Sequence, residues 1–279
     1  MDVFSAIADI RRVRWSEPRA TWGFVPTMGF LHEGHLSLVR RARQENDRVG
    51  VSIFVNPTQF NEPDDLATYP SDLDRDLRLL ENEGVDLVWN PSQDTVYPPG
   101  YETYVDVTEV TKVLEGAARP GFFRGVATVV TKLFNVFQPN RTYFGQKDAQ
   151  QAVVIRRMAA DLNFPIEVIV CPTIREPDGL AMSSRNANLP PAARREATCL
   201  YHALLAAKEL FEGGERNAER LRATMAGIIN AVELARLDYV SVAHPDTLQE
   251  QAVVHDRALL SLAVFFNDVR LIDNMVVER

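Results

Sequence analysis

Short apolar runs alternate with amphipathic segments along the first half of the chain. The apolar runs occupy 21–27, 49–56 and 85–91, and the segments between them, 35–47 and 71–84, carry apolar residues at helical spacing. The runs are almost continuously apolar, as strands of a parallel sheet are when helices cover both of its faces. The order strand, helix, strand, helix, strand therefore predicts a parallel sheet with crossover helices.

The next segments extend this pattern. Residues 126–137 place apolar side chains at helical spacing, which outweighs their β-branched content and predicts a packed helix. A short run at 141–145, a helix over about 148–163 and a strand at 166–173 follow, each closed by turn residues. The complete pattern predicts an α/β fold with a Rossmann-like, doubly wound parallel sheet.

The pattern changes after Thr173. A polar loop at 174–191 precedes two helix-length segments and a small set of apolar runs, at 192–212, 218–235, 237–244, 257–266 and 269–277. We therefore predict two domains, residues 1–175 and a smaller α+β domain at 176–279, with the boundary near Arg175. No internal repeat is visible, which excludes repeat architectures.

Composition narrows the classes of function. The 279 residues are 46% hydrophobic and 24% charged, as in an ordinary soluble globular chain with room for a cleft between domains. The net charge of −8 excludes a general basic surface for a nucleic-acid backbone, so no nucleic-acid partner is expected. No run of roughly 18 apolar residues occurs and the first residues lack an apolar signal segment, so we expect a cytoplasmic protein without a membrane partner.

Two cysteines, Cys171 and Cys199, lie far apart and form no CxxC pattern. This spacing disfavours a disulfide framework or a zinc knuckle and fits a reducing compartment. We expect both to be small buried hydrophobic residues rather than nucleophiles.

Two histidines, His32 and His35, stand three apart where the first apolar run gives way to an amphipathic segment. A metal site is disfavoured, because the spacing is not that of HExxH and no third ligand is evident. Packing is the usual role of a lone histidine. These two, however, flank Gly34 at the carboxyl end of a predicted strand, where open α/β sheets bind ligands.

The helix after these histidines is expected to begin at about His35 or Leu36. Its unpaired N–H groups and positive dipole end would then face a bound phosphate. Gly29 and Gly34 allow the backbone to approach such a ligand closely, and two imidazoles can donate to its oxygens. The pattern indicates a nucleotide site.

Two further loops suit phosphate. Ser183, Ser184 and Arg185 bring two hydroxyls and a planar cation together, although a helix cap with a solvated arginine is the alternative. Lys147 and Asp148 stand at a strand-to-helix break, where the lysine can meet phosphate charge and the aspartate can cap the helix or bind a ribose hydroxyl. A surface lysine is the alternative for Lys147.

Two glutamines lie near these loops. Gln59 follows a predicted strand at its carboxyl end, and Gln151 lies one turn after Lys147. An amide offers a donor and an acceptor to a hydroxy acid. A solvent-facing glutamine remains the alternative for each.

Taken together, the segments "PTMGFLHEGH", "SIFVNPTQF", "YFGQKDAQQ", "MSSRN" and "RLIDN" resemble the pantothenate synthetase family of pantoate–β-alanine ligases. The resemblance runs from about Trp22 to Asn274. HxGH alone would indicate the broader nucleotidyltransferase superfamily shared with class I aminoacyl-tRNA synthetases, in which the serine-rich loop stands where a KMSKS-type loop would be.

The resemblance implies an AMP-forming ligase with three small-molecule substrates, pantoate, β-alanine and ATP. Pantoate would first form pantoyl adenylate with release of pyrophosphate, and the β-alanine amine would then displace AMP. Magnesium is expected through the ATP phosphates, without assigned protein ligands. Residues 1–175 would bind ATP and pantoate, residues 176–279 would close over the active site, and the chain would form a homodimer.

The resemblance also implies roles for individual residues. His35 stands in the proton-donor position, and His32, Lys147 and Arg185 complete the catalytic set. Gln59 and Gln151 fall on pantoate positions, Gln59 being shared with β-alanine. The ATP-binding positions are Met28, Gly29, Phe30, Leu31, His32, Glu33, Gly34, His35, Gly145, Gln146, Lys147, Asp148, Ile174, Met182, Ser183, Ser184 and Arg185.

One residue departs from the family pattern. Phe122 in "RPGFFRGV" stands where many relatives are expected to have histidine, whereas "GQKD" for "GEKD" is an ordinary variation.

Two other functions compete with this interpretation. Another HxGH adenylyltransferase, acting on a phosphorylated pantetheine or nicotinamide mononucleotide, is disfavoured by the two glutamines and by the chain length. A non-catalytic nucleotide sensor is disfavoured because His35, Lys147 and Arg185 are all present.

Overall fold

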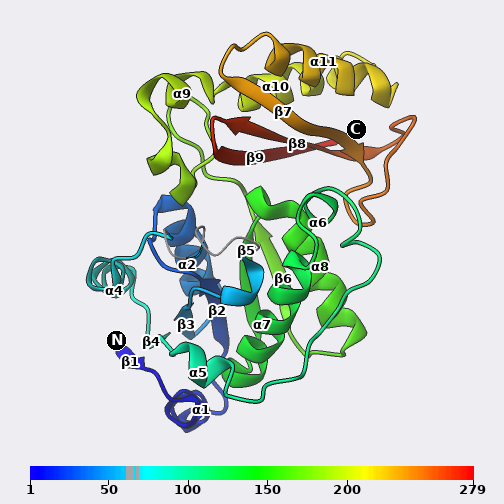
Figure 1. Ribbon diagram of the computed structural model, residues 1–279. Coiled ribbons are helices and arrows are strands. Elements are labelled where there is room, and N and C mark those ends of the chain that lie inside the picture. The colour runs from blue at the N-terminus through cyan, green and yellow to red at the C-terminus, as the bar shows by residue number, and fades with distance from the viewer. Residues whose placement is uncertain (61–65, 67–68) are drawn as a thin grey trace. The chain divides into compact units, whose positions relative to one another are not determined.

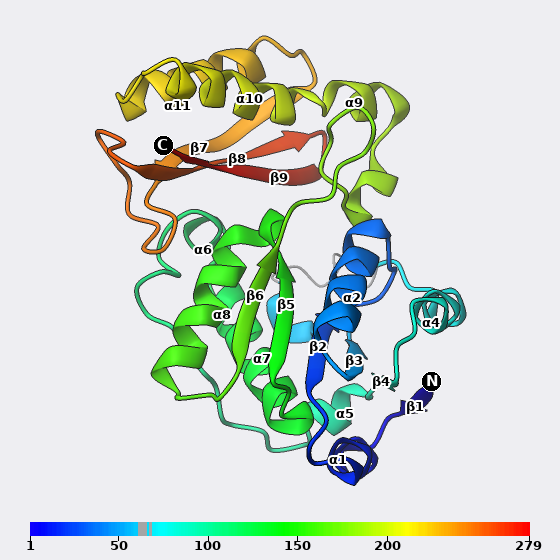
Figure 2. The same ribbon diagram turned by 180° about the vertical axis from the view of Figure 1, so that it is seen from behind.

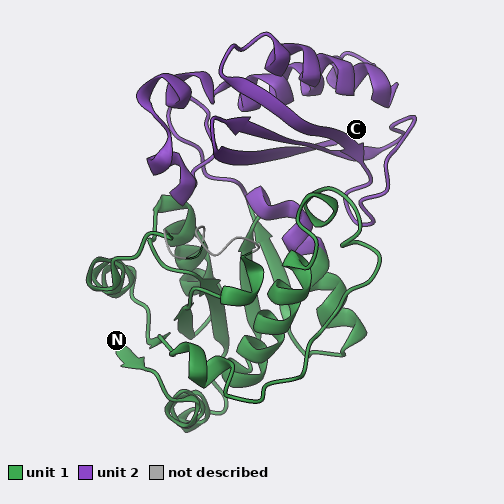
Figure 3. Ribbon diagram, in the orientation of Figure 1, with its two compact units in different colours: residues 1–145, 154–171 green, residues 146–153, 172–279 purple. Residues whose placement is uncertain are grey.

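The computed structural model describes residues 1–60, 66 and 69–279, which form two compact units (Figures 1 and 3). Unit 1 comprises 1–145 and 154–171, and unit 2 comprises 146–153 and 172–279. The chain therefore passes from one unit to the other three times. The assignment of 146–153 to unit 2 is a feature that the sequence pattern did not indicate.

Unit 1 contains a six-stranded sheet in the order β1-β4-β3-β2-β5-β6, and all of its strand pairs are parallel. The strands are β1 Asp2–Phe4, β2 Trp22–Thr27, β3 Arg48–Ile53, β4 Leu87–Trp89, β5 Arg141–Gly145 and β6 Glu167–Cys171. The strands predicted from the apolar runs are confirmed, and β1 adds an edge strand. The order of the strands reverses between β2 and β5, which is the switch point where sheets of this kind bind ligands.

Helices cover both faces of this sheet, with α2 and α7 on opposite sides (Figures 1 and 2). On one face Leu38 and Leu80, from α2 and α4, pack against strand residues such as Val51. On the other, the Phe137 ring of α7 stacks on Phe24 of β2 at 4.2 Å. The helices of this unit are α1 Ile7–Ser16, α2 Glu33–Glu45, α4 Leu73–Asn82, α5 Gln93–Val96, α6 Glu115–Ala118, α7 Phe122–Phe137 and α8 Ala149–Asp161, whose first turn belongs to unit 2.

Unit 2 contains an antiparallel sheet in the order β7-β8-β9, with α10 and α11 packed against it (Figure 1). Its core includes Phe211 and Leu221 from the helices and Leu260 from β8, all almost fully buried. The elements are α9 Pro191–Glu196, α10 Cys199–Glu212, α11 Ala218–Asn230, β7 Ala235–Ala243, β8 Arg257–Phe266 and β9 Val269–Glu278.

Two predictions for this unit were wrong in detail. The single helix expected over 192–212 is divided into α9 and α10, where the Thr198 hydroxyl donates to the Arg195 carbonyl and competes with the helical backbone. The helix expected to reach residue 235 ends at Asn230, because alternation of apolar and polar residues from Ala235 onward favours a strand. Cys171 and Cys199 are buried free thiols, as predicted.

Candidate active site

The turn between β2 and α2 holds the two histidines. Gly29 and Phe30 both have positive φ, 85° and 50°, so the chain turns sharply after β2. The helix begins at Glu33, two to three residues earlier than expected, with His32 as its N-cap. The prediction was wrong because it did not anticipate that imidazoles would satisfy the first N–H groups of the helix.

The hydrogen bonds of these imidazoles define their neutral tautomers. Nδ1 of His32 accepts the N–H of Gly34 at 3.1 Å, and Nδ1 of His35 accepts the N–H of His32 at 3.3 Å. Because Nδ1 is the acceptor in both rings, each neutral imidazole carries its hydrogen on Nε2. The ring centroids are 4.1 Å apart. The structure therefore places two imidazole N–H donors together at a helix N-terminus, a location suited to an anion.

A buried carboxylate from α4 fixes the turn that precedes these histidines. Oδ2 of Asp76 accepts the N–H of Phe30 at 2.7 Å, and Oδ1 accepts the N–H of Leu31 at 2.8 Å. Asp76 is only 1% exposed; burial raises its pKa, while the two N–H groups oppose that rise. Sequence reasoning missed this residue because "SDLDRDLRLL" reads as the polar face of an amphipathic helix.

Gln59 belongs to a second network in unit 1, formed around Asn56. Nδ2 of Asn56 donates to Oε1 of Gln59 at 3.0 Å, and Nε2 of Gln59 donates to Sδ of Met28 at 2.9 Å. Asn56 is in turn bound by the hydroxyl of Tyr97, which donates to its Oδ1 at 2.8 Å. Gln59 is 9% exposed, so the solvent-facing alternative is wrong for it. Two residues predicted for different substrates, Met28 and Gln59, are thus in direct contact.

Phe122 lies beside this network. The guanidinium of Arg119 stacks 3.9 Å from the centre of the Phe122 ring, and its Nη2 donates to the carbonyl of Gln59 at 3.2 Å. The Phe122 ring therefore packs against Arg119, which in turn contacts the backbone of Gln59, a predicted pantoate-binding residue.

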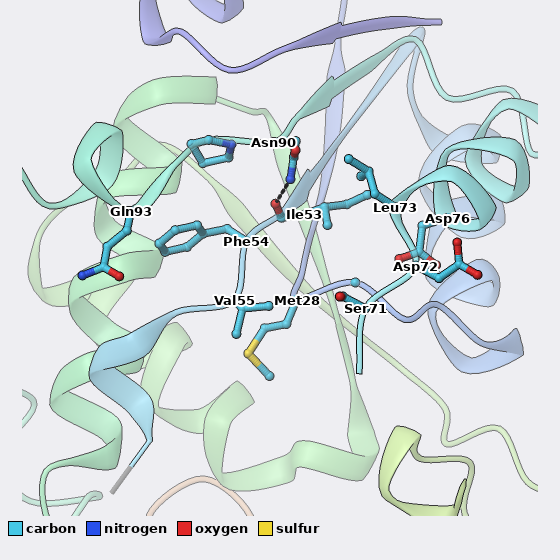
Figure 4. Close-up of a pocket in the computed structure, with 12 residues that line it drawn as sticks. Met28, Ile53, Phe54, Val55, Ser71, Asp72, Leu73, Asp76, Asn90 and Gln93 are labelled. Atoms are coloured by element: carbon cyan, nitrogen blue, oxygen red, sulfur yellow. Dashed lines mark hydrogen bonds between the residues drawn. The ribbon is translucent and has the colours of Figure 1, made fainter. Parts of the chain in front are cut away.

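A cavity of about 260 Å³ opens at the carboxyl ends of β2, β3 and β4 (Figure 4). Met28 and Asp76 are among the side chains that line it, and the amide of Asn90 donates to the carbonyl of Ile53 at its edge, at 2.9 Å. The lining residues are Met28, Gly29, Ile53, Phe54, Val55, Ser71, Asp72, Leu73, Asp76, Asn90, Pro91 and Gln93. Strands β2, β3 and β4 therefore end around a partly apolar cavity next to the turn that holds His32 and His35.

In unit 2, a short 3-10 helix at Gln146–Asp148 carries three predicted ATP residues. The Lys147 side chain is 19% exposed, and its Nζ lies 3.5 Å from Oδ1 of Asp148. Lys147 is therefore mostly buried, whereas the surface-lysine alternative requires a solvent-exposed side chain. Gln151 follows in the first turn of α8 and is half-buried.

The other predicted ATP residues of unit 2 lie on the polar loop between β6 and α9. The N–H of Met182 donates to the carbonyl of Ile174 at 3.0 Å, which closes the loop. Ser183 caps a 3-10 helix at Ser184–Asn188, its Oγ accepting the N–H of Arg185 at 3.3 Å. The Ser183 side chain therefore caps this 3-10 helix, and the turn it stabilises presents Ser184 and Arg185, both half-buried.

Within residues 1–60, 66 and 69–279, no group of three or more His, Cys, Asp or Glu side chains could hold a metal ion. None of the helices described is long and apolar enough to cross a bilayer.

The strand order around β2 and the histidine cap of α2 define a Rossmann-like nucleotide-binding domain of the HxGH nucleotidyltransferase type. The chain also matches the family described as Pantoate-beta-alanine ligase over residues 2–276, and it belongs to that family.

Individual relatives agree over the full length. The chain is 60% identical over 278 residues to a pantothenate synthetase of Roseiflexus sp. (strain RS-1), with all of both chains covered. It is 57% identical over 279 residues to that of Chloroflexus aurantiacus (strain J-10-fl), covering 100% of this chain and 99% of the relative.

Solved structures show the same fold. The pantothenate synthetase from Thermus thermophilus superimposes with a TM-score of 0.94 at 47% identity, covering 99% of each chain. The pantoate-beta-alanine ligase from Francisella tularensis, complexed with beta-gamma ATP and beta-alanine, gives a TM-score of 0.81 at 38% identity, covering 99% of this chain and 97% of that one. These matches confirm the predicted fold class.

Proposed function

We propose that this chain condenses pantoate with β-alanine at the expense of ATP, giving pantothenate, AMP and pyrophosphate. The observation that carries the proposal is the family match over residues 2–276, together with 60% identity to a pantothenate synthetase along the entire chain. A structural neighbour complexed with an ATP compound and beta-alanine supports two of these substrates, ATP and β-alanine.

In the first step, an oxygen of the pantoate carboxylate attacks the α-phosphorus of ATP and pyrophosphate leaves. A carboxylate is a poor acylating group until this oxygen becomes part of a good leaving group, and the adenylate supplies one. Such a transfer is accelerated mainly by positioning and by neutralisation of phosphate charge. Magnesium, which is expected to accompany ATP, would add to the neutralisation of phosphate charge, and no residue of this chain is assigned to hold it.

Within unit 1, the histidine turn is proposed to bind the phosphates. Its Nε2–H groups, on His32 and His35, are suitable donors to phosphate oxygens because Nδ1 of each ring already accepts a backbone N–H. The positive end of the α2 dipole adds to this attraction. His35 is proposed as the proton donor to the developing negative charge.

Within unit 2, Lys147 and Arg185 are proposed to neutralise polyphosphate charge. An ammonium and a guanidinium each make charge-assisted hydrogen bonds to phosphate oxygens, with the planar guanidinium able to bind two at once. The hydroxyls of Ser183 and Ser184 and the remaining predicted ATP residues are proposed for the same substrate.

In the second step, the β-alanine amine attacks the acyl carbon of pantoyl adenylate and AMP leaves. Gln59 and Gln151 are proposed to orient pantoate, and Gln59 also β-alanine. Although Gln59 already contacts Asn56 and Met28, its amide has a second hydrogen and a second lone pair that suit a hydroxy acid. A homodimeric assembly and a cytoplasmic location are part of the proposal and rest on the family resemblance.

Quench-flow measurement of pyrophosphate tests both the order of the steps and the substrate. With ATP, magnesium and pantoate alone, we expect a burst of about one pyrophosphate per site, and turnover only after β-alanine is added. A burst that requires β-alanine contradicts the adenylate-first order, and equal use of an acid without hydroxyls contradicts the pantoate assignment of the glutamines. Failure to form pantothenate from the three substrates overturns the function itself.

A further inference from the structure

Asn274 lies near the middle of β9. Within the described residues, its side chain forms all of its hydrogen bonds with the Gln146–Asp148 segment. Its Nδ2 donates to the carbonyls of Gln146 and Lys147 at 3.0 and 2.8 Å, and its Oδ1 accepts from Nε2 of Gln146 at 2.9 Å. Asn274 is 5% exposed. The side-chain amide of asparagine carries two N–H donors and an oxygen acceptor. It can therefore donate to the two carbonyls and accept from the Gln146 amide at the same time.

These contacts constrain the backbone on both sides of one residue. The carbonyl of Gln146 belongs to the peptide plane before the Cα of Lys147, and the carbonyl of Lys147 belongs to the plane after it. Because peptide groups are planar, restraining both carbonyls restricts φ and ψ of Lys147 and therefore the direction of its Cα–Cβ bond. Asn274 thus sets the direction in which the Lys147 side chain leaves the backbone.

Asp273, the preceding residue of β9, contacts the other candidate ATP loop. Its carboxylate forms a bidentate ion pair with Arg175, at 2.6 and 3.0 Å. Arg175 also donates to the carbonyl of Gly179 at 3.0 Å, and its guanidinium lies 4.3 Å from the centre of the Tyr201 ring. Asp273 is 2% exposed; burial raises its pKa and the guanidinium opposes that rise.

This ion pair holds the start of the loop that leads to Arg185. Arg175 directly follows Ile174, whose carbonyl accepts the N–H of Met182, so anchoring Arg175 anchors both strands of the loop. A buried ion pair is weak evidence for stability, since apolar residues of similar size often stabilise a protein as well or better. Its bidentate geometry does, however, fix a loop in one conformation.

We infer that Asp273 and Asn274 are positioning residues for ATP: Asn274 orients Lys147, and Asp273 orients the loop that carries Ser183 to Arg185. The two residues are adjacent on β9, and the segments that they contact also belong to unit 2. The inference rests on the proposed function, which assigns Lys147 and Arg185 to the polyphosphate.

Two variants of Asn274 test the inference by steady-state kinetics of pyrophosphate release. Asn274→Ala removes both donated bonds, and Asn274→Asp keeps the shape but turns a carboxylate toward two carbonyl oxygens. Each should lower kcat/KM for ATP about tenfold or more, while KM for β-alanine stays within about twofold. Asp273→Asn, which keeps the shape but removes the charge facing Arg175, should show the same selectivity for ATP.

Val277→Ala is the matched control, because Val277 lies on the same strand, is 2% exposed and packs in the core of unit 2. It should lower the thermal midpoint while leaving kcat/KM for ATP, per folded molecule, within about twofold of the parent. A merely structural role for Asn274 would make its variants behave in the same way.

The inference is overturned if Asn274→Ala and Asn274→Asp fold and keep kcat/KM for ATP within twofold, or if they lose no more than Val277→Ala does. If neither folds, Asn274→Ser and Asp273→Asn are judged by the same criterion. Absence of pantothenate formation by the parent chain counts against the proposed function alone. Calorimetric titration of the parent and variants with magnesium ATP then decides the inference, a tenfold weaker affinity supporting it and an unchanged affinity overturning it.

Discussion

The carboxylate of Asp76 accepts the backbone N–H of Phe30 at 2.7 Å, across 46 positions of sequence. Phe30 has a φ of 50°, in the left-handed region that residues with a side chain seldom adopt, and it follows Gly29 at 85°. The buried carboxylate therefore stabilises an unfavourable backbone conformation immediately before His32, the cap of α2.

Replacing Asp76 by alanine should destabilise the protein substantially. The N–H groups of Phe30 and Leu31 would lose their acceptor, at a cost of about 1–3 kcal/mol for each one left unpaired. Urea unfolding measures the loss. Asp74→Ala, on the exposed side of the same helix, is the control and should change stability by about 0.5 kcal/mol or less. Equal losses in the two variants would contradict this account of the turn.

The raised pKa of Asp76 predicts a pH dependence with a definite sign. A carboxyl whose pKa is higher in the folded than in the unfolded state binds its proton more tightly when folded. Its contribution to stability is therefore full below the unfolded pKa and is lost as pH rises through the folded pKa. Relative to Asp76→Asn, which cannot titrate, the parent chain should gain stability as pH falls from about 7 to about 4. Urea unfolding of both proteins across this range gives the difference, and the opposite trend would show that the N–H groups outweigh burial.

Removing either proposed phosphate-binding cation should slow adenylate formation. Charge-assisted hydrogen bonds contribute about 1.5–3 kcal/mol each, so Lys147→Ala and Arg185→Ala should reduce the single-turnover rate about 10- to 100-fold. Lys208→Ala is the control, since Lys208 forms an exposed i,i+4 ion pair with Glu212 and has no proposed role. Rates within a factor of two of the parent in both cation variants would refute their assignment.

His35→Ala should separate catalysis from stability. The first half-reaction should slow strongly, whereas stability should fall by only about 1 kcal/mol, because the cap hydrogen bond that Nδ1 of His35 accepts from the N–H of His32 is lost. His244 provides a matched control, since its Nδ1 also accepts a backbone N–H, from Asp246, and it has no proposed role. His244→Ala should leave single-turnover kinetics unchanged. A large stability loss with normal kinetics in His35→Ala would instead indicate a structural histidine.

The architecture of unit 1 was largely predictable, because its strands are buried on both faces and leave long apolar runs in the sequence. Several short elements escaped this reasoning, among them β1 and α1. The strand β1 is three residues long and mostly exposed, and α1 buries only Ile10 and Arg14, so neither has a strong apolar pattern. The break between α9 and α10 was equally hidden, because it depends on a local hydroxyl contact of Thr198 and not on periodicity.

The candidate site was predictable only where chemistry is concentrated in short segments, as at His32 and His35 or Ser183 to Arg185. The residues that hold these segments in place could not be identified in this way. Asp76 and Asn274 find their partners 46 and more than 120 positions away. Their roles depend on where a helix or strand packs, so in the sequence they resemble ordinary polar residues. The segment "RLIDN" contributes to the family resemblance but does not indicate a role for Asn274.

The assignment of residues 146–153 to unit 2 limits how this protein can be divided or recombined. No single cut separates the units, because the segment that Asn274 binds is encoded between two parts of unit 1. A fragment covering 172–279 would lack Gln146 and Lys147, so the Asn274 amide would lose its protein partners. A chimera that exchanges unit 2 with a relative must therefore transfer the internal segment as well. A truncation or gene fusion at any single position therefore divides at least one of the two units.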